Sequence, residues 1–414
     1  MRNLLTGILL SWGGLLYGQE LVFTTPVPLS SAVNSDDEEL APLLSPDGKT
    51  LYFIRAFHEG NTGGKFAGTD IWVSRKDEQG QWMPASRMDH AWNNKRSNAV
   101  IGINAEQNVV YLLNGYTNKS GISFSKLLNG QWSQPEFISI PGINRDDFVG
   151  FYVNSQFDVI FISMKGKDTL GEEDLYISLK DSAGNWTEPR NLGPTINTSG
   201  FEIAPFLSED KKRLYFSSNG HGGFGDADIF YSDRLFDSWE TWSVPKNLGG
   251  EINSAVFDGY FMQGSDSLVH FVSNRKKLVT ADIFESFLVS SKHSKKDTAE
   301  VIYLSDSEIE KLFGKNFISA IEFEKNSSII GPLQLARIAN LGRNLNSDRT
   351  LKIHLVARRE ANSTALEVNK LRLFNILESF KKAGIEGSRI TFGSEILKDF
   401  SQVTEGIVML KFYR

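Results

Sequence analysis

The sequence contains no cysteine among its 414 residues. Disulfide bonds, thiolate chemistry and lipid attachment at a lipobox cysteine are therefore all excluded. If the protein is held at a membrane, partner proteins must hold it there.

An excess of positive charge is also absent. Lysine and arginine number 44 against 50 aspartate and glutamate residues, which gives a net charge of −6 and a pI near 5.7. Affinity for nucleic acid depends on basic side chains that neutralise phosphates, so we expect no nucleic-acid partner. No segment after the N-terminus has the length and apolar character of a transmembrane helix, so we expect no membrane span in the mature chain.

Local motifs for metal binding and catalysis are missing as well. No two histidines are spaced by two or four residues, as a local zinc site would need; the six are His58, His90, His221, His270, His293 and His354. The sequence has no Gly-x-Ser-x-Gly elbow and no phosphate-binding glycine loop. We therefore predict no catalytic residue, no metal and no cofactor, and hence a protein that is not an enzyme.

Residues 1–18 have the features of a signal peptide. Arg2 supplies the positive end, an apolar run follows from Leu4 to Leu16, and Gly18 offers a small residue for cleavage before Gln19. A membrane anchor is the alternative, but the run is short compared with the ~20 residues that cross a bilayer. We expect export and cleavage.

Most of the chain consists of repeats. A strand-like unit of the form Asp-Ile-Trp-Val-Ser recurs at steps of 51, 53, 54 and 54 residues; its copies are residues 69–74, 120–125, 173–178, 227–232 and 281–286. Gly121 replaces the aspartate in the second copy. A turn and a second short strand precede each copy, at residues 45–53, 108–112, 159–162, 213–217 and 267–271. A period of this length dictates the architecture.

Each repeat has the composition of a propeller blade. Four copies continue into a tryptophan followed by a proline, at Trp82 to Pro84, Trp132 to Pro135, Trp186 to Pro189 and Trp242 to Pro245. Short aromatic-rich strands separated by Gly and Pro are typical of β-propellers, and five repeats of about 54 residues fill residues 19–290. Residues 27–35 echo residues 244–254, so we predict that the N-terminal strand completes the last blade and removes an open sheet edge.

Two copies carry a family resemblance. Glu39-Leu40-Ala41-Pro42 with residues 45–53, and Glu202-Ile203-Ala204-Pro205 with residues 214–220, resemble the WD-like repeats of TolB-type propellers. Such repeats are common in envelope proteins of Bacteroidota. The resemblance implies a five-bladed β-propeller over residues 19–290.

The periodicity changes after residue 290. Residues 291–314 begin with a polar stretch and are predicted to be a linker. Beyond it, helical spacing at 333–345 and 366–383 alternates with strand-like runs at 318–323, 351–357, 389–392 and 406–412. The order β-α-β-α-β-β predicts a small α/β sandwich over residues 315–414, with helices on one sheet face.

This order, with residues 321–323 at its start and Gly384-Ile385-x-x-x-Arg389-Ile390 after the second helix, resembles an OmpA-like peptidoglycan-binding domain. In that family an aspartate and an arginine hold the diaminopimelate group. Arg372 stands where the family's arginine is expected, whereas Ala357 or Arg358 replaces the aspartate. Ala365 and Asn369 likewise depart from the family's helix motif. An amine needs a carboxylate partner when it is desolvated, so we expect a degenerate domain that docks rather than binds the wall.

Acidic residues offer alternatives that we weighed. The segment from Gly220 to Asp228 could hold calcium, but its aspartate recurs in four repeats, as a turn residue would. The pairs Asp36-Asp37, Asp146-Asp147 and Glu172-Glu173 could act as acid and base, but they fall in polar loops. Repeating aromatic residues such as Phe53, Trp72 and Tyr215 are expected in the core.

These patterns predict a non-enzymatic scaffold of the bacterial envelope, periplasmic or associated with the outer membrane. The propeller would bind envelope or outer-membrane proteins, and the C-terminal domain would dock at the cell wall or at an outer-membrane complex. The resemblance associates such combinations with type IX secretion and gliding machinery. A peptidoglycan-binding anchor and a propeller glycan hydrolase are the alternatives. Converging carboxylates at the propeller axis would favour the hydrolase, and an exposed apolar patch on one face would favour the scaffold.

Overall fold

The computed structural model describes most of the chain in two compact units. The described ranges are residues 21–88, 91–116, 121–143, 148–264, 267–277, 279–289, 303–315, 317, 319–324, 327–358, 363–385, 389–395 and 407–414. The predicted signal peptide and residues 291–302 of the predicted linker lie outside them. We call Leu21–Ser291 the repeat unit, and the C-terminal unit lies within Lys292–Arg414. Across the described ranges, no helix is long and apolar enough to cross a membrane.

The repeat unit contains five antiparallel sheets, one for each sequence repeat. Their first strands are β3 (Glu38–Leu44), β7 (Val100–Ile103), β12 (Phe148–Val153), β16 (Glu202–Leu207) and β20 (Asp258–Gln263). Their second strands are β4 (Thr50–Ala56), β8 (Val109–Leu113), β13 (Val159–Met164), β17 (Arg213–Ser218) and β21 (Leu268–Ser273). Their third strands are β5 (Asp70–Arg75), β9 (Ile122–Leu128), β14 (Asp174–Leu179), β18 (Asp228–Asp233) and β22 (Asp282–Val289). The predicted mainly β class is thus confirmed.

Short strands complete the sheets at their outer edges. In the first four sheets these are β6 (Ser86–Arg87), β10 (Gln131–Trp132), β11 (Glu136–Ile138), β15 (Arg190–Asn191) and β19 (Lys246–Asn247). In the fifth sheet, β1 (Val22–Phe23) and β2 (Val27–Pro28) pair with β22. The prediction that the N-terminal segment completes the last repeat is therefore confirmed.

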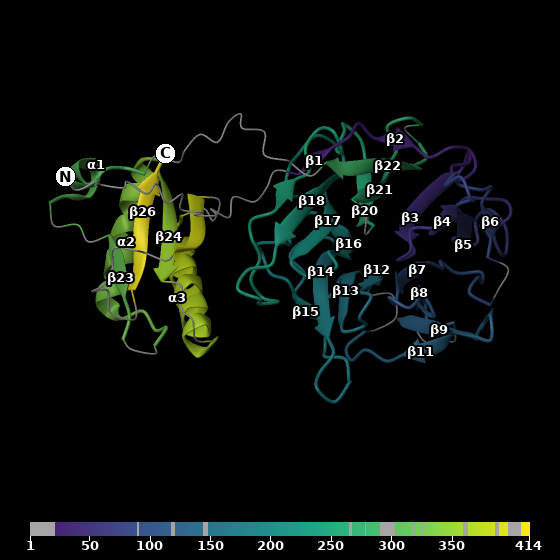
Figure 1. The fold of residues 1–414 in the computed structure, drawn as a ribbon, viewed down its shortest axis with the longest axis horizontal. Coiled ribbons are helices and arrows are strands. Elements are labelled where there is room, and N and C mark those ends of the chain that lie inside the picture. The colour runs from purple at the N-terminus through teal and green to yellow at the C-terminus, as the bar shows by residue number, and fades with distance from the viewer. Residues whose placement is uncertain are drawn as a thin grey trace, which may run out of the picture. The chain divides into compact units, whose positions relative to one another are not determined.

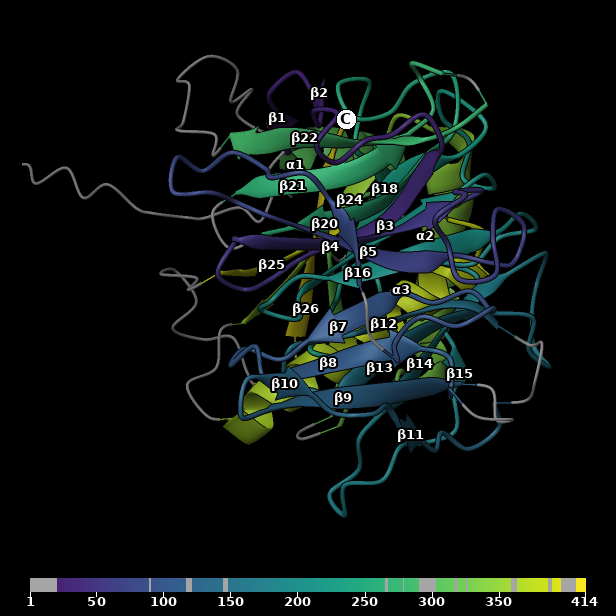
Figure 2. The same cartoon turned by 90° about the vertical axis from the view of Figure 1, so that its right-hand side faces the viewer.

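The five sheets follow one another around a common centre. Neighbouring first strands contact one another from β3 to β7, β12, β16 and β20, and β20 contacts β3 in turn. Figure 1 shows these strands innermost, with the later strands of each sheet further out. Figure 2 shows β7, β8 and β9 of the second sheet side by side. The hydrophobic core lies between sheets: Phe161 and Phe216 share a cluster between the third and fourth, and Phe53 and Ile283 share one between the first and fifth.

An asparagine, buried in three of the four cases, joins each described pair of adjacent sheets. Its amide group bonds both the N–H and the C=O of the residue after the first position of a third strand, as a further strand residue would. The pairs are Asn93 with Ile71, Asn197 with Leu175, Asn253 with Ile229, and Asn34 with Ile283. The last pair joins residues 249 positions apart, so the N-terminal segment forms the same junction as its internal counterparts.

The described residues of the C-terminal unit form one sheet and three helices. The sheet order is β23 (Ala320–Glu322), β26 (Ile407–Tyr413), β24 (Lys352–Arg358) and β25 (Ile390–Glu395), with only β24 and β25 parallel. The helices are α1 (Asp306–Phe313), α2 (Pro332–Ser347) and α3 (Ser363–Lys382). From β23 onward the elements follow the predicted β-α-β-α-β-β order.

Helix α1 corrects the predicted linker, residues 291–314. Leu304 donates its N–H to Phe412 O at 2.8 Å, and the Phe313 ring lies 4.7 Å from that of Phe412. The helix begins with a capping box: the Ser305 side chain accepts the main-chain N–H of Glu308, and the Glu308 side chain accepts the main-chain N–H of Ser305. The Ser-x-x-Glu pattern is a helix start signal that can be read from the sequence. It indicates a helix here even though polar residues precede it.

Candidate functional site

Three first strands carry a completely buried carboxylate at their first or second position. Glu39, Glu202 and Asp258 each have 0% exposure. Each accepts hydrogen bonds from the main-chain N–H and the hydroxyl of the residue four positions earlier, which are Ser35, Thr198 and Ser254 at 2.5–3.0 Å. These acids therefore fix the segment that connects one sheet to the next.

A second set of buried carboxylates holds the loops between the second and third strands. Asp70, Asp174 and Asp228 begin third strands and are at most 2% exposed. They accept loop N–H groups from Thr62 at 2.7 Å, Leu170 at 2.9 Å and Phe224 at 2.6 Å. Burial raises the pKa of Asp228, and the Phe224 N–H and the Asn247 amide oppose this rise. The prediction that this recurring aspartate is a hydrogen-bonding turn residue is confirmed.

The carbonyl before each junction asparagine also receives a side-chain donor. The donors come from the end of the second strand or the loop after it, yet their chemistry differs between sheets. They are Arg55 on Val33 O, Tyr116 on Trp92 O, His221 on Ile196 O and Arg275 on Ile252 O. His221 therefore holds the main chain through Nε2 at 2.7 Å.

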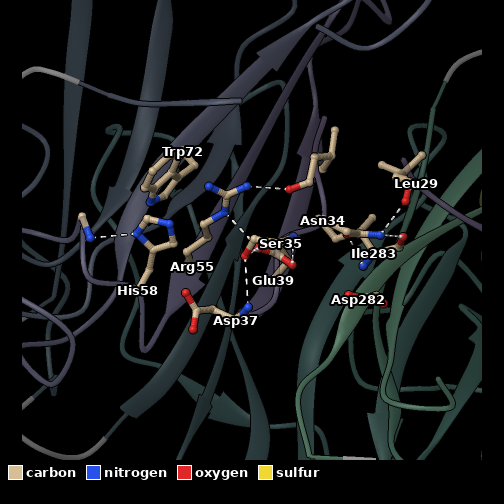
Figure 3. Close-up of polar contacts among 12 residues, drawn as sticks. Leu29, Asn34, Ser35, Asp37, Glu39, Arg55, His58, Trp72, Asp282 and Ile283 are labelled. Carbon is tan, nitrogen blue, oxygen red and sulfur yellow. Dashed lines mark hydrogen bonds and ion pairs between the residues drawn. The ribbon is translucent and has the colours of Figure 1, made fainter. Parts of the chain in front are cut away.

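The junction between the fifth and first sheets holds a network of polar contacts (Figure 3). The Arg55 guanidinium lies 2.9 Å from Glu39 Oε1 and 4.1 Å from the centre of the Trp72 ring. His58 packs edge-on against Trp72 at 4.6 Å. Burial and then the nearby Arg55 lower the pKa of His58. Burial raises the pKa of Glu39, and the hydrogen bonds from Ser35 together with the charge of Arg55 oppose this rise.

The other predicted acids and histidines are dispersed. Asp36 and Glu172 are exposed in loops, Glu173 lies 3.5 Å from Lys165, and Asp146-Asp147 lie outside the described residues. His270 is buried 3.2 Å from Glu285, His354 is buried near Tyr303, and His90 and His293 lie outside the described ranges. Among the residues that the structure describes, no group of three or more His, Asp or Glu side chains could hold a metal ion.

The loops held by the buried aspartates present large apolar side chains to solvent. Phe66, Leu170 and Phe224 each stand four residues before such an aspartate, and their exposures are 84%, 51% and 54%. In the fifth sheet Val279, three residues before Asp282, is 87% exposed. We call these four loops the loop face.

The four loops lie at equivalent ends of their sheets. A main-chain carbonyl of each loop accepts a hydrogen bond from an N–H at or near the start of the following first strand, over 2.6–2.9 Å. The pairs are Asn98 to Thr69, Glu202 to Glu173, Asp258 to Ala227 and, across the closing junction, Glu39 to Ala281. Since the first strands surround one centre, loops beside their starts share one side of the repeat unit.

In the C-terminal unit, Arg372 is buried with 4% exposure. It donates to Ser327 O at 2.7 Å and Glu324 O at 3.2 Å, and its guanidinium lies 5.3 Å from the Phe323 ring centre. These bonds fix the chain between β23 and α2, while the proposed contact of Arg372 with peptidoglycan stays a prediction. The side chains at 357, 358, 365 and 369 lie outside what the structure describes.

No protein-family model and no curated protein matches the sequence. Among solved structures, TolB from Acinetobacter baumannii is similar with 12% identity and a TM-score of 0.39 over 63% of this chain. The chain spans 56% of the length of that TolB. An endo-arabinase from Bacteroides thetaiotaomicron has 12% identity and a TM-score of 0.40, covering 64% of this chain and 98% of its own.

A third solved structure matches a smaller share of the chain. The C-terminal domain of MotB from Helicobacter pylori has 12% identity and a TM-score of 0.21, and the match covers 24% of this chain and 86% of that domain. The neighbours thus include TolB, a MotB domain and an endo-arabinase. The function proposed below therefore rests on this chain's own residues.

Two features of the site were missed in the sequence. The buried acid of the first strand follows a hydroxyl residue by four positions, and the exposed apolar residue precedes the aspartate of the third strand by four. Both spacings recur and could have been found by aligning the repeats. The burial of the acids and the exposure of the apolar residues could not have been found in this way, because acids are ordinarily exposed and phenylalanines ordinarily buried.

Proposed function

We propose that this chain is a non-enzymatic binding scaffold of the bacterial envelope. Residues 19–290 act as a five-bladed β-propeller that binds a partner protein through the loop face, and residues 315–414 act as an OmpA-like domain that docks at the wall or an outer-membrane complex. One observation carries the proposal: an exposed apolar side chain recurs at the same place in loops that buried aspartates hold rigid.

The exposure of large apolar side chains to water is unfavourable, and a bound partner that covers them would remove this unfavourable contribution. Contiguous exposed apolar patches are uncommon in monomeric proteins and are typical of interfaces, and the recurring exposed residues of the loop face would supply apolar contacts to such an interface. The loops beneath Leu170 and Phe224 are already fixed by Asp174 and Asp228, so a partner would order little chain on binding. A rigid apolar surface therefore supports protein binding.

The carboxylates of the repeat unit support the same proposal over a glycan hydrolase. A hydrolase needs two carboxyl groups about 5 to 10 Å apart that face the substrate. The carboxylate oxygens of Glu39, Glu202 and Asp258 instead accept hydrogen bonds from main-chain N–H and hydroxyl groups inside the fold. We accordingly propose that the chain is not an enzyme.

Docking by the C-terminal domain is proposed over peptidoglycan binding because of the place of Arg372. Its guanidinium donates to two main-chain carbonyls beneath the surface, which leaves it poorly placed to meet a wall peptide. Export to the periplasm or the outer membrane, and a role in secretion or gliding complexes, belong to this proposal.

Site-specific photo-crosslinking in cells tests the interaction face. A photoreactive residue replaces Phe66, Leu170, Phe224 or Val279, and matched controls carry it at Gln79 and Ala183, which are exposed in hairpins after third strands. We expect one shared adduct from several loop-face positions and none from the two controls. Adducts of equal yield at the controls, or none at the loop face, would contradict the proposal.

A further inference from the structure

The loop of the first sheet differs from the other three on the loop face. It spans residues 57–69 and carries two exposed phenylalanines, Phe57 at 49% and Phe66 at 84%. Their ring centres lie 6.4 Å apart in an edge-to-face arrangement. An aromatic pair of this kind offers a ready surface for a third apolar side chain.

The position of Phe57 is built into the fold. Its φ is 56°, a left-handed backbone that is unfavourable for a side chain of this size. Asn61, 5% exposed, holds the loop by donating to Arg55 O and Gly68 O and by accepting the Trp72 indole N–H at 3.2 Å. A strained residue that is held rigidly yet exposes its ring is consistent with selection for contact rather than for stability.

Basic residues lie in and beside this loop. Lys65 lies in the loop itself, and Lys95 of the next junction segment packs against Gly63. Arg96 follows Lys95, and its main chain touches Gly68. Across residues 57–69 and 91–98, Lys65, Lys95 and Arg96 stand against Glu59, and the carboxylate of Asp37 also acts on His58 of this loop. We call Phe57, Lys65, Phe66, Lys95 and Arg96 the aromatic-basic corner.

We propose that the aromatic-basic corner binds an acidic segment of the partner protein and receives an apolar side chain of that segment against Phe57 and Phe66. This inference rests on the proposed function of the loop face and names the chemistry of its partner. The phenylalanines supply the hydrophobic anchor, and the lysines supply attraction over the Debye length of about 8 Å at physiological salt. A second copy of this chain is the competing occupant, which the sedimentation measurement below distinguishes.

Fluorescence anisotropy with a labelled random copolymer of glutamate and tyrosine tests the inference on the full mature chain. Polyglutamate and a copolymer of lysine and tyrosine are the comparison probes. We expect the glutamate-tyrosine copolymer to bind most tightly and its affinity to fall as salt rises. Phe66→Ser should weaken it about tenfold, as expected for an anchor residue.

Matched variants separate the two contributions. The double substitution Lys65→Glu and Lys95→Glu should abolish binding and its salt dependence. Gln79→Ser, in the exposed hairpin after β5 of the same sheet, should leave the affinity within about twofold, since Gln79 belongs neither to the corner nor to the loop face. Phe57→Gly should weaken binding without strain in the fold.

Several results would overturn the inference. Equal binding of the lysine-tyrosine copolymer, or unchanged affinity in Phe66→Ser, would exclude an acidic apolar segment at this corner. A dimer in sedimentation equilibrium that Phe66→Ser abolishes would assign the corner to a second copy. If the corner substitutions leave copolymer binding unchanged while crosslinks from positions 170 and 224 persist, the inference about the corner is wrong and the loop face stands. If those crosslinks are absent as well, the proposed function is also rejected.

Discussion

The repeat unit and the C-terminal unit hold the main chain of their loops with different sets of buried side chains. The repeat unit uses buried acids in addition to donors such as Arg55 and Arg275. In the repeat unit, buried carboxylates such as Glu202 and Asp228 accept loop N–H groups. In the C-terminal unit, buried arginines donate to loop carbonyls: Arg372 to residues 324 and 327, and Arg389 to Leu345, Asp348 and Leu351. Loop polar groups removed from water need partners in both, and either sign of side chain can supply them.

The difference affects how each unit responds to mutation. Buried carboxylates recur at three junctions of the repeat unit, so the loss of one leaves similar ones in place. Arg389 by itself joins α2 to β24 through three carbonyls. The C-terminal unit should therefore be the more sensitive of the two to a single substitution.

The two units can be observed separately. Apart from Trp12 in the predicted signal peptide, all tryptophans fall between residues 72 and 242, in the repeat unit. Among the described residues, α-helices occur only in the C-terminal unit. Tryptophan fluorescence thus follows one unit, and circular dichroism at the helix band follows the other.

Arg389→Ala should give the largest effect and sharpen the comparison most. Three carbonyls lose a charged donor at an 8% exposed site, so we expect the C-terminal unit to lose about 3 kcal/mol or more. In a urea titration, the midpoint of the helix signal should fall to a lower urea concentration than in the wild type, and the midpoint of the tryptophan signal should stay the same. Arg343→Ala, an exposed arginine of α2, is the control. Coincident shifts of both signals would refute separate units.

Asn34→Ala tests whether the closing junction equals the internal ones. The Asn34 amide bonds Leu29 O and both main-chain groups of Ile283 over 2.9–3.0 Å. We expect a loss of about 2 kcal/mol in the tryptophan transition, similar to that of Asn253→Ala, which removes the corresponding bonds to Ile229. A much smaller loss for Asn34 would mean that the N-terminal segment frays independently of the ring.

Glu285→Gln should give a smaller, pH-dependent effect at the same junction. The bond from His270, together with Lys76 and Trp82 of the first sheet, lowers the pKa of Glu285 below its ordinary 4.5. A lowered pKa in the fold stabilises the ionised form, so this contribution is present above pH 4.5 and is lost as pH falls through the folded value.

Unfolding measured by tryptophan fluorescence should therefore show wild type ahead of Glu285→Gln at pH 7. The gap should shrink as the pH drops below 4.5. A gap that widens toward acid pH would contradict the sign of this shift.

Phe57→Gly should give the smallest effect on stability. Glycine relieves the left-handed backbone but gains freedom in the unfolded chain, so the two terms nearly cancel. Phe66 has no such backbone, and Phe66→Gly should be less stable than Phe57→Gly by about 1 kcal/mol. Equal losses in urea titration would show that the strain at Phe57 is negligible.

The sequence predicted the repeat unit better than the C-terminal unit, and the reason is repetition. Each blade-like copy confirms the others, so the strands at residues 69–74 and 227–232 were placed together with their turn aspartates. Helix α1 has no second copy, and its capping box was overlooked beside the polar residues before it. In the same way, Arg372 was selected by its place in a resemblance, while its bonds to loop carbonyls depend on a chain segment about 45 residues away.

By itself the sequence determined the number of sheets, the strands within each and the return of the N-terminal segment to the last sheet, because period and alternation are local properties of the chain. Only the tertiary structure decided which polar residues are buried and which apolar residues are exposed. Glu39 is fully buried and Phe66 is 84% exposed, since burial depends on neighbours that folding brings from other repeats. The loop face therefore exists only once the sheets have assembled.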